Sequence, residues 1–106
     1  MGKYLFQATY TSEGAKGLAR DGGSLRRSSL EIALTDLGGK MESFYYAFGD
    51  VDAFAIAELP DHESAAAFAL AATQSGAVTV KTTVLMTAKE MDKAVKKVVA
   101  YKAPGR

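Results

Sequence analysis

The chain has 106 residues, no cysteine and 24% charged side chains, which almost cancel to a net charge of +1. This length predicts one small domain, residues 1–106, and the missing cysteine excludes disulfides, thiolate nucleophiles and Cys-ligated metal or cluster sites. The balanced charge gives no general attraction to nucleic acid, and no apolar run approaches the about 18 residues of a membrane span. We therefore expect a cytoplasmic protein with neither nucleic-acid nor membrane partners.

The first third of the chain predicts a strand followed by an interrupted helix. Residues 3–10 are aromatic and apolar with polar alternation, which is typical of a strand with one wetter face. Thr11 begins a short helix as its cap. Gly22 and Gly23 interrupt it, because glycine costs about 1 kcal/mol inside a helix. The helix restarts at Ser24 and stops at a second glycine pair. Its apolar face comprises Leu30, Ala33, Leu34 and Leu37.

A hairpin is expected in mid-chain, with strands 41–48 and 51–59 meeting at a Gly-Asp turn. Pro60 ends the second strand because it has no N–H for the ladder. Asp61 then caps an alanine-rich helix over residues 62–74.

The last third predicts one more strand and one more helix. Residues 77–86 are rich in valine and threonine, which favours a strand. Thr87 and Glu90 have the spacing of a capping box, so a helix begins at Thr87 or Ala88. The tail, residues 103–106, is expected to fray. The apolar stripe of this helix is expected to comprise Met91, Ala94, Val95, Val98 and Val99.

The predicted order β-α-β-β-α-β plus a C-terminal helix is an α+β, ferredoxin-like arrangement with a four-stranded antiparallel sheet and two helices on one face. Both sheet faces carry large apolar groups, so a single copy would expose an apolar patch. We therefore expect a homodimer in which two sheets pack together. Alternation places Tyr4, Phe6, Ala8 and Tyr10 opposite Leu5, Gln7 and Thr9, and places Phe44, Tyr46 and Phe48 opposite Met41, Ser43, Tyr45 and Ala47.

Several segments resemble one protein family. Residues 3–11 (KYLFQATYT), Gly14, Lys16-Gly17-Leu18, and the segments 37–40 (LGGK), 48–52 (FGDVD) and 81–85 (KTTVL) are similar to the GYD family of small bacterial and archaeal proteins. Asp50 stands where the family's Gly-Tyr-Asp motif has tyrosine. The resemblance runs over residues 1–86 and implies a dimeric α/β barrel, closed by two ferredoxin-like sheets. It implies no particular activity.

Two carboxylates and two phenols are the candidate catalytic and orienting groups. Asp52 lies in a strand, where aspartate is depleted, and is the candidate general base. Tyr10 or Tyr46 would orient a substrate in that case. The competing interpretation is structural: Asp50 and Asp52 satisfy turn N–H groups, and the tyrosines pack in the core or an interface.

Candidate ligand-binding residues lie around the hairpin and the glycine break. Lys16, Arg26 and Arg27 would neutralise an anion there, although solvated surface is the competing interpretation, and no nucleotide-binding glycine motif is present. His62 is the single histidine and is expected at the surface, so neither a metal site nor a cofactor is predicted. The favoured function is a homodimer that binds a small apolar or anionic ligand or assists another protein. The alternative is a cofactor-independent oxygenase or isomerase with Asp52 as base. The ligand-binding candidates are Asp50, Asp52, Tyr45, Tyr46, Lys16 and Arg26.

Overall fold

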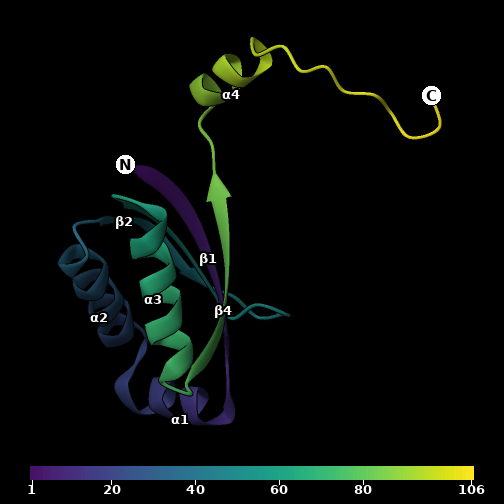
Figure 1. Ribbon diagram of the computed structural model, residues 1–106. Coiled ribbons are helices and arrows are strands. Elements are labelled where there is room, and N and C mark those ends of the chain that lie inside the picture. Colours follow the sequence, from purple (N-terminus) through teal and green to yellow (C-terminus); the bar gives the residue numbers. More distant parts are fainter.

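A computed structural model describes residues 1–106 as a four-stranded antiparallel sheet of order β2-β3-β1-β4 with helices on one face (Figure 1). The predicted α+β, ferredoxin-like fold is confirmed, with the first helix divided in two. The elements are β1 (Gly2–Tyr10), α1 (Ser12–Asp21), α2 (Gly23–Asp36), β2 (Lys40–Tyr46), β3 (Ala53–Leu59), α3 (His62–Gln74), β4 (Val78–Leu85) and α4 (Ala88–Val95).

The predicted helix boundaries follow from local chemistry. The Thr11 side chain accepts a hydrogen bond from the Gly14 N–H and caps α1, and Asp61 caps α3 by accepting from Ser64. Gly22 has a φ of +84°, a conformation that favours glycine, and this residue separates α1 from α2. The capping box of Thr87 and Glu90 is confirmed at the start of α4.

Helices α1, α2 and α3 cover one face of the sheet, and the core lies between them and the strands (Figure 1). Tyr4 and Phe6 of β1 are buried there, and Phe6 meets Phe68 of α3 edge-on with ring centroids 4.8 Å apart. The opposite face of the sheet, called the open face below, carries no helix. Its members from the two central strands are Lys3, Leu5, Gln7, Thr9, Phe54, Ile56 and Glu58.

Two details of the predicted hairpin are wrong. The strands end at Tyr46 and restart at Ala53, so a six-residue loop, residues 47–52, replaces the tight turn. Met41 does not share a face with Ser43, because the register shifts between them by a β-bulge. The bulge turns Met41 toward the helices, where it is buried on the same face as Phe44.

The C-terminal helix is shorter than its apolar pattern predicts. α4 ends at Val95 and is capped by Lys96, so Val98 and Val99 lie beyond it rather than on its stripe. α4 projects past the end of β4, and the remaining chain runs on away from the three other helices (Figure 1). No helix of the structure has the length and apolar character that crossing a membrane requires.

Candidate functional site

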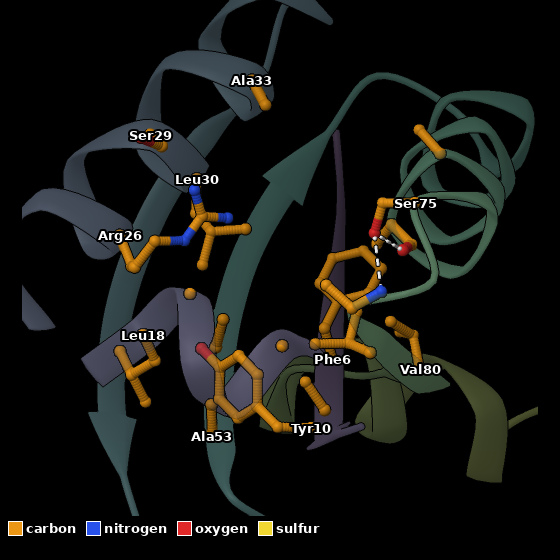
Figure 2. Close-up of a pocket in the computed structure, with 18 of the residues that line it drawn as sticks. Phe6, Tyr10, Leu18, Arg26, Ser29, Leu30, Ala33, Ala53, Ser75 and Val80 are labelled. Atoms are coloured by element: carbon orange, nitrogen blue, oxygen red, sulfur yellow. Dashed lines mark hydrogen bonds between the residues drawn. The ribbon is translucent and has the colours of Figure 1, made fainter. Parts of the chain in front are cut away.

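A cavity of about 590 Å³ lies between the sheet and helices α1, α2 and α3 (Figure 2). Strands β1 and β3 form its floor and the helices form its walls. Most of its lining is apolar. Volumes of this order are typical of sites for small molecules, which are concave, mostly apolar and furnished with a few polar groups. The apolar lining includes Phe6, Ala8, Leu18, Leu30, Ala33, Phe44, Ala53, Ala55, Phe68, Ala71, Ala72 and Val80.

Small side chains account for the hollow. On β3 the residues that face the helices are Ala53, Ala55 and Ala57, whereas the larger Phe54 and Ile56 point to the open face. On α3 the residues Ala71 and Ala72 also line the cavity. Alanines from both elements therefore line the cavity, and Phe68 of α3 is the one large side chain that these two elements contribute to its lining.

Polar side chains also reach this mostly apolar cavity, and they comprise Tyr10, Glu13, Arg20, Asp21, Arg26, Ser29 and Ser75. Arg26 extends from α2 into the cavity, and the Tyr10 ring lies on its floor at the end of β1 (Figure 2). Arg26 is half-buried and forms neither an ion pair nor a side-chain hydrogen bond, whereas its neighbour Arg27 pairs with Glu31 at 3.7 Å. The cavity thus presents a cation without an anionic partner.

Burial raises the pKa of Tyr10 above its usual value of 10.0, the nearby Tyr46 phenol adds to the rise, and the Arg26 charge opposes it. Tyr10 therefore remains protonated at neutral pH. Its hydroxyl group is a hydrogen-bond donor beside the Arg26 guanidinium.

The two aspartates of the hairpin lie outside the cavity lining. The Asp52 carboxylate accepts a hydrogen bond from the Tyr10 backbone N–H at 2.8 Å, and the Asp52 N–H donates to Ala8. Asp52 therefore ties the end of β1 to the hairpin loop. Asp50 is exposed, and its backbone carbonyl accepts from Thr9 Oγ1 at 3.1 Å. The Asp52 charge is the smallest of the influences that raise the pKa of Tyr10.

The remaining candidates are divided between the cavity and its surroundings. Tyr46 donates its hydroxyl proton to the Gly23 carbonyl at 2.9 Å, so it connects β2 to the start of α2. Tyr45 is 72% exposed on the other side of β2. Lys16 is exposed on α1, 3.9 Å from Glu13. The structure therefore brings Tyr10 and Arg26 together, with Tyr46 beside them, and leaves Tyr45, Lys16 and Asp50 outside.

His62 is exposed, as its position at a helix start predicts, but its Nδ1 lies 2.7 Å from the hydroxyl oxygen of the buried Tyr4. This contact links α3 to β1 within the core and places the ring away from the cavity. No group of three or more His, Asp or Glu side chains is arranged to hold a metal ion.

The open face is the second candidate site. Its centre is apolar, since Leu5 lies opposite Ile56 and Tyr45 lies opposite Phe54. One end carries a charged cluster in which Lys3 pairs with Glu42 and lies 3.5 Å from Glu58. The hydrogen bond to Glu42 is the main reason that the pKa of Lys3 is raised. The face thus has an apolar centre and a polar edge.

Sequence reasoning missed the alanines that line the cavity. Ala53 and Ala55, which line the cavity, and Ala57, which is buried in the core, alternate with Phe54 and Ile56. This inverted alternation of small and large residues was visible in the sequence. It indicates a strand whose larger side chains point away from its own helices.

Comparison with protein families matches residues 4–95 to the GYD domain. The resemblance that the sequence motifs suggested is therefore confirmed, and the match extends through α4. No curated protein and no solved structure shows significant similarity to the chain.

Proposed function

The chain belongs to the GYD domain family, and we propose that it is a homodimeric binding protein that holds a small amphipathic carboxylate in the cavity between its sheet and helices. The observation that carries this proposal is Arg26, a half-buried cation without an anionic partner in an apolar cavity. A charge that is partly removed from water is stabilised by a counter-ion. A bound anion would supply that counter-ion.

The chemistry of the polar groups favours a carboxylate over other anions. A guanidinium offers parallel N–H donors that match the two oxygens of a carboxylate. The protonated Tyr10 hydroxyl is a further donor. Arg26 is the one cation of the cavity without a partner, since Arg20 lies 3.6 Å from Asp21. One free cation balances a singly charged group better than a doubly charged phosphate.

The body of the ligand is expected to be apolar. The floor and walls around Arg26 are alanine, leucine, valine and phenylalanine side chains, such as Ala55, Leu30 and Phe68. Apolar surface removed from water contributes about 25 cal/mol per Å². An acyl chain or a ring would therefore supply most of the binding free energy, while Arg26 would select the charged end.

The open face of the sheet supports the homodimer part of the proposal. Leu5, Phe54 and Ile56 lie on the side of the sheet that has no helix. An apolar sheet face of this kind is a common protein interface, and a self-complementary face gives a twofold dimer. Closure of two such sheets into a barrel is the arrangement we propose.

The geometry favours binding over the alternative function, a cofactor-independent oxygenase or isomerase. That alternative needs a base in the cavity, and Asp52 was the candidate. Its carboxylate accepts from the Tyr10 backbone N–H and is not part of the cavity lining. The two carboxylates that do line the cavity each lie beside a basic side chain, Glu13 at 3.9 Å from Lys16 and Asp21 at 3.6 Å from Arg20. Arg26 and Tyr10 are the lining groups suited to bind and orient an anion.

Isothermal titration calorimetry with decanoate tests the ligand proposal. We expect decanoate to bind, and Arg26→Gln to weaken binding about tenfold to a hundredfold, because hydrogen bonds to charged groups contribute about 1.5–3 kcal/mol. Arg27→Gln is the matched control, since Arg27 lies outside the cavity lining and should leave the affinity unchanged. Ala55→Leu fills the cavity and should abolish binding in a folded protein. Equal affinities of Arg26→Gln and wild type, or equally tight binding of neutral decanol, would contradict the proposal.

A further inference from the structure

The C-terminal arm, defined as residues 86–106, is folded at its start yet makes no more than marginal contact with the rest of the chain. It projects beyond β4 (Figure 1). The radius of gyration is 16.8 Å, whereas a compact domain of about 100 residues has a value of about 13 Å. The arm therefore enlarges the molecule without adding to its core.

The arm exposes large apolar side chains along its whole length. Val98 is 98% exposed. The helix within the arm, α4, has only eight residues. Isolated helices of that length are marginal in water and depend on packing of an apolar face. A surface outside this chain's own body is therefore needed to stabilise the arm. The exposed apolar members are Met86, Met91, Val95, Val98, Val99 and Tyr101.

The charges of the chain divide between the arm and the body. Residues 86–106 carry six basic and two acidic side chains, a net charge of +4. Residues 1–85 carry seven basic and ten acidic side chains, a net charge of −3. The near-neutral total conceals this division, and it makes the body of another copy electrostatically complementary to the arm.

The connection between β4 and α4 carries the arm away from its own body. It consists of Met86 and Thr87 alone, and Thr87 is held in the capping box with Glu90. Through this short connection the chain continues past the end of β4 and does not turn back over the sheet (Figure 1). The arm therefore reaches outward, as Figure 1 shows.

We infer that the C-terminal arm of one copy packs on the body of a second copy, so that two chains exchange arms. This inference rests on the dimer part of the proposed function, because an arm that extends past the end of β4 meets a second copy only when the two copies pack together. The apolar side chains of the arm are buried against the partner. Its lysines lie over the partner's acidic body.

Isotope-resolved photo-crosslinking tests the exchange directly. The natural chain has no cysteine, so Val98→Cys can be labelled at one site with a benzophenone maleimide. Labelled ¹⁴N and ¹⁵N proteins are mixed, allowed to exchange subunits and irradiated. We expect mixed-isotope peptides that join the arm to residues 1–85. Cross-links confined to chains of one isotope, or their complete absence, would overturn the inference.

Sedimentation velocity gives a second readout that does not depend on labelling. Met91→Ser with Val95→Ser removes the apolar contacts of α4 and should raise the dimer dissociation constant at least tenfold. An unchanged dissociation constant would overturn the inference. Vesicles of phosphatidylserine and phosphatidylcholine are added in a separate run, and binding of the arm to these vesicles with release from the partner would also overturn it. Decanoate binding by this variant should match wild type, because the arm lies outside the cavity lining. Failure of the arm exchange is thereby distinguished from failure of the ligand site.

Discussion

The two faces of the sheet differ in what their side chains meet, although the same strands supply both. On the helix side, Phe6 is buried against Phe68, and the alanines of β3 leave a cavity. On the open side, Leu5 and Ile56 lie opposite each other without a covering helix. Strand β3 thus presents its small residues to its own helices and its large residues outward. One strand thus borders a cavity on one side of the sheet and contributes to an apolar surface on the other.

The variants Phe6→Ala and Leu5→Ala compare what the two faces of the sheet contribute to stability, because these adjacent residues point to opposite faces. Phe6→Ala should lower the free energy of unfolding by about 3–5 kcal/mol, because it removes a buried ring from the core. This loss should be the same at low and high protein concentration. Leu5→Ala should destabilise mainly through the dimer, so its effect should depend on concentration. Urea unfolding at two protein concentrations measures both.

Equal, concentration-independent losses for Phe6→Ala and Leu5→Ala would contradict the assignment of the open face to a dimer interface. Thr73→Ala, on the exposed surface of α3, is the control and should change the free energy of unfolding by about 0.5 kcal/mol or less.

Asp52→Ala tests whether the carboxylate stabilises the hairpin or acts in the cavity. It leaves the Tyr10 backbone N–H without its acceptor, so the free energy of unfolding should fall by about 1–3 kcal/mol. Decanoate affinity should remain close to wild type in the folded variant. Asp50→Ala is the matched control, because the structure assigns a hydrogen bond to its backbone carbonyl and not to its carboxylate. Loss of decanoate binding with unchanged stability would place Asp52 in the ligand site instead.

Two glycines of α1 test how closely this helix packs against its neighbours on the helix side of the sheet. A Cβ on Gly14 would overlap the Ala77 carbonyl, so Gly14→Ala should destabilise the fold by about 1–3 kcal/mol through overpacking. A Cβ on Gly17 would find only the Arg20 side chain, 4.0 Å away. Gly17→Ala should therefore stabilise the protein by up to about 1 kcal/mol, because alanine favours a helix. Thermal unfolding measures both, and shifts of the same sign would contradict the close approach of α1 to Ala77.

Much of the fold was predictable because its signals are local. Thr11, Asp61 and the pair Thr87 and Glu90 each satisfy helix N–H groups within three residues of themselves. The bulge after Met41 was not predictable in this way. Strict alternation assigns Met41 to the wrong face, since one extra residue in a strand reverses every side chain before it.

The candidate site was predictable only as a set of residues. Tyr10, Tyr46 and Arg26 were identified for their chemistry, but their proximity depends on where β1, β2 and α2 lie in space. The arm shows the same limit, because its apolar periodicity continues to Val99 whereas α4 ends at Val95. Periodicity records which side chains are apolar and not whether a helix persists without a surface to pack on.

The order of the elements, the helix starts, the break at Gly22 and the family follow from the sequence alone, because each depends on contacts or motifs within a few residues. Three features depend on the folded structure: alanines of β3 and α3 line one cavity, Arg26 reaches it without an anionic partner, and Asp52 binds the Tyr10 backbone. The physical reason is distance along the chain. These contacts join residues on different elements, and their geometry exists only after the sheet and helices have packed.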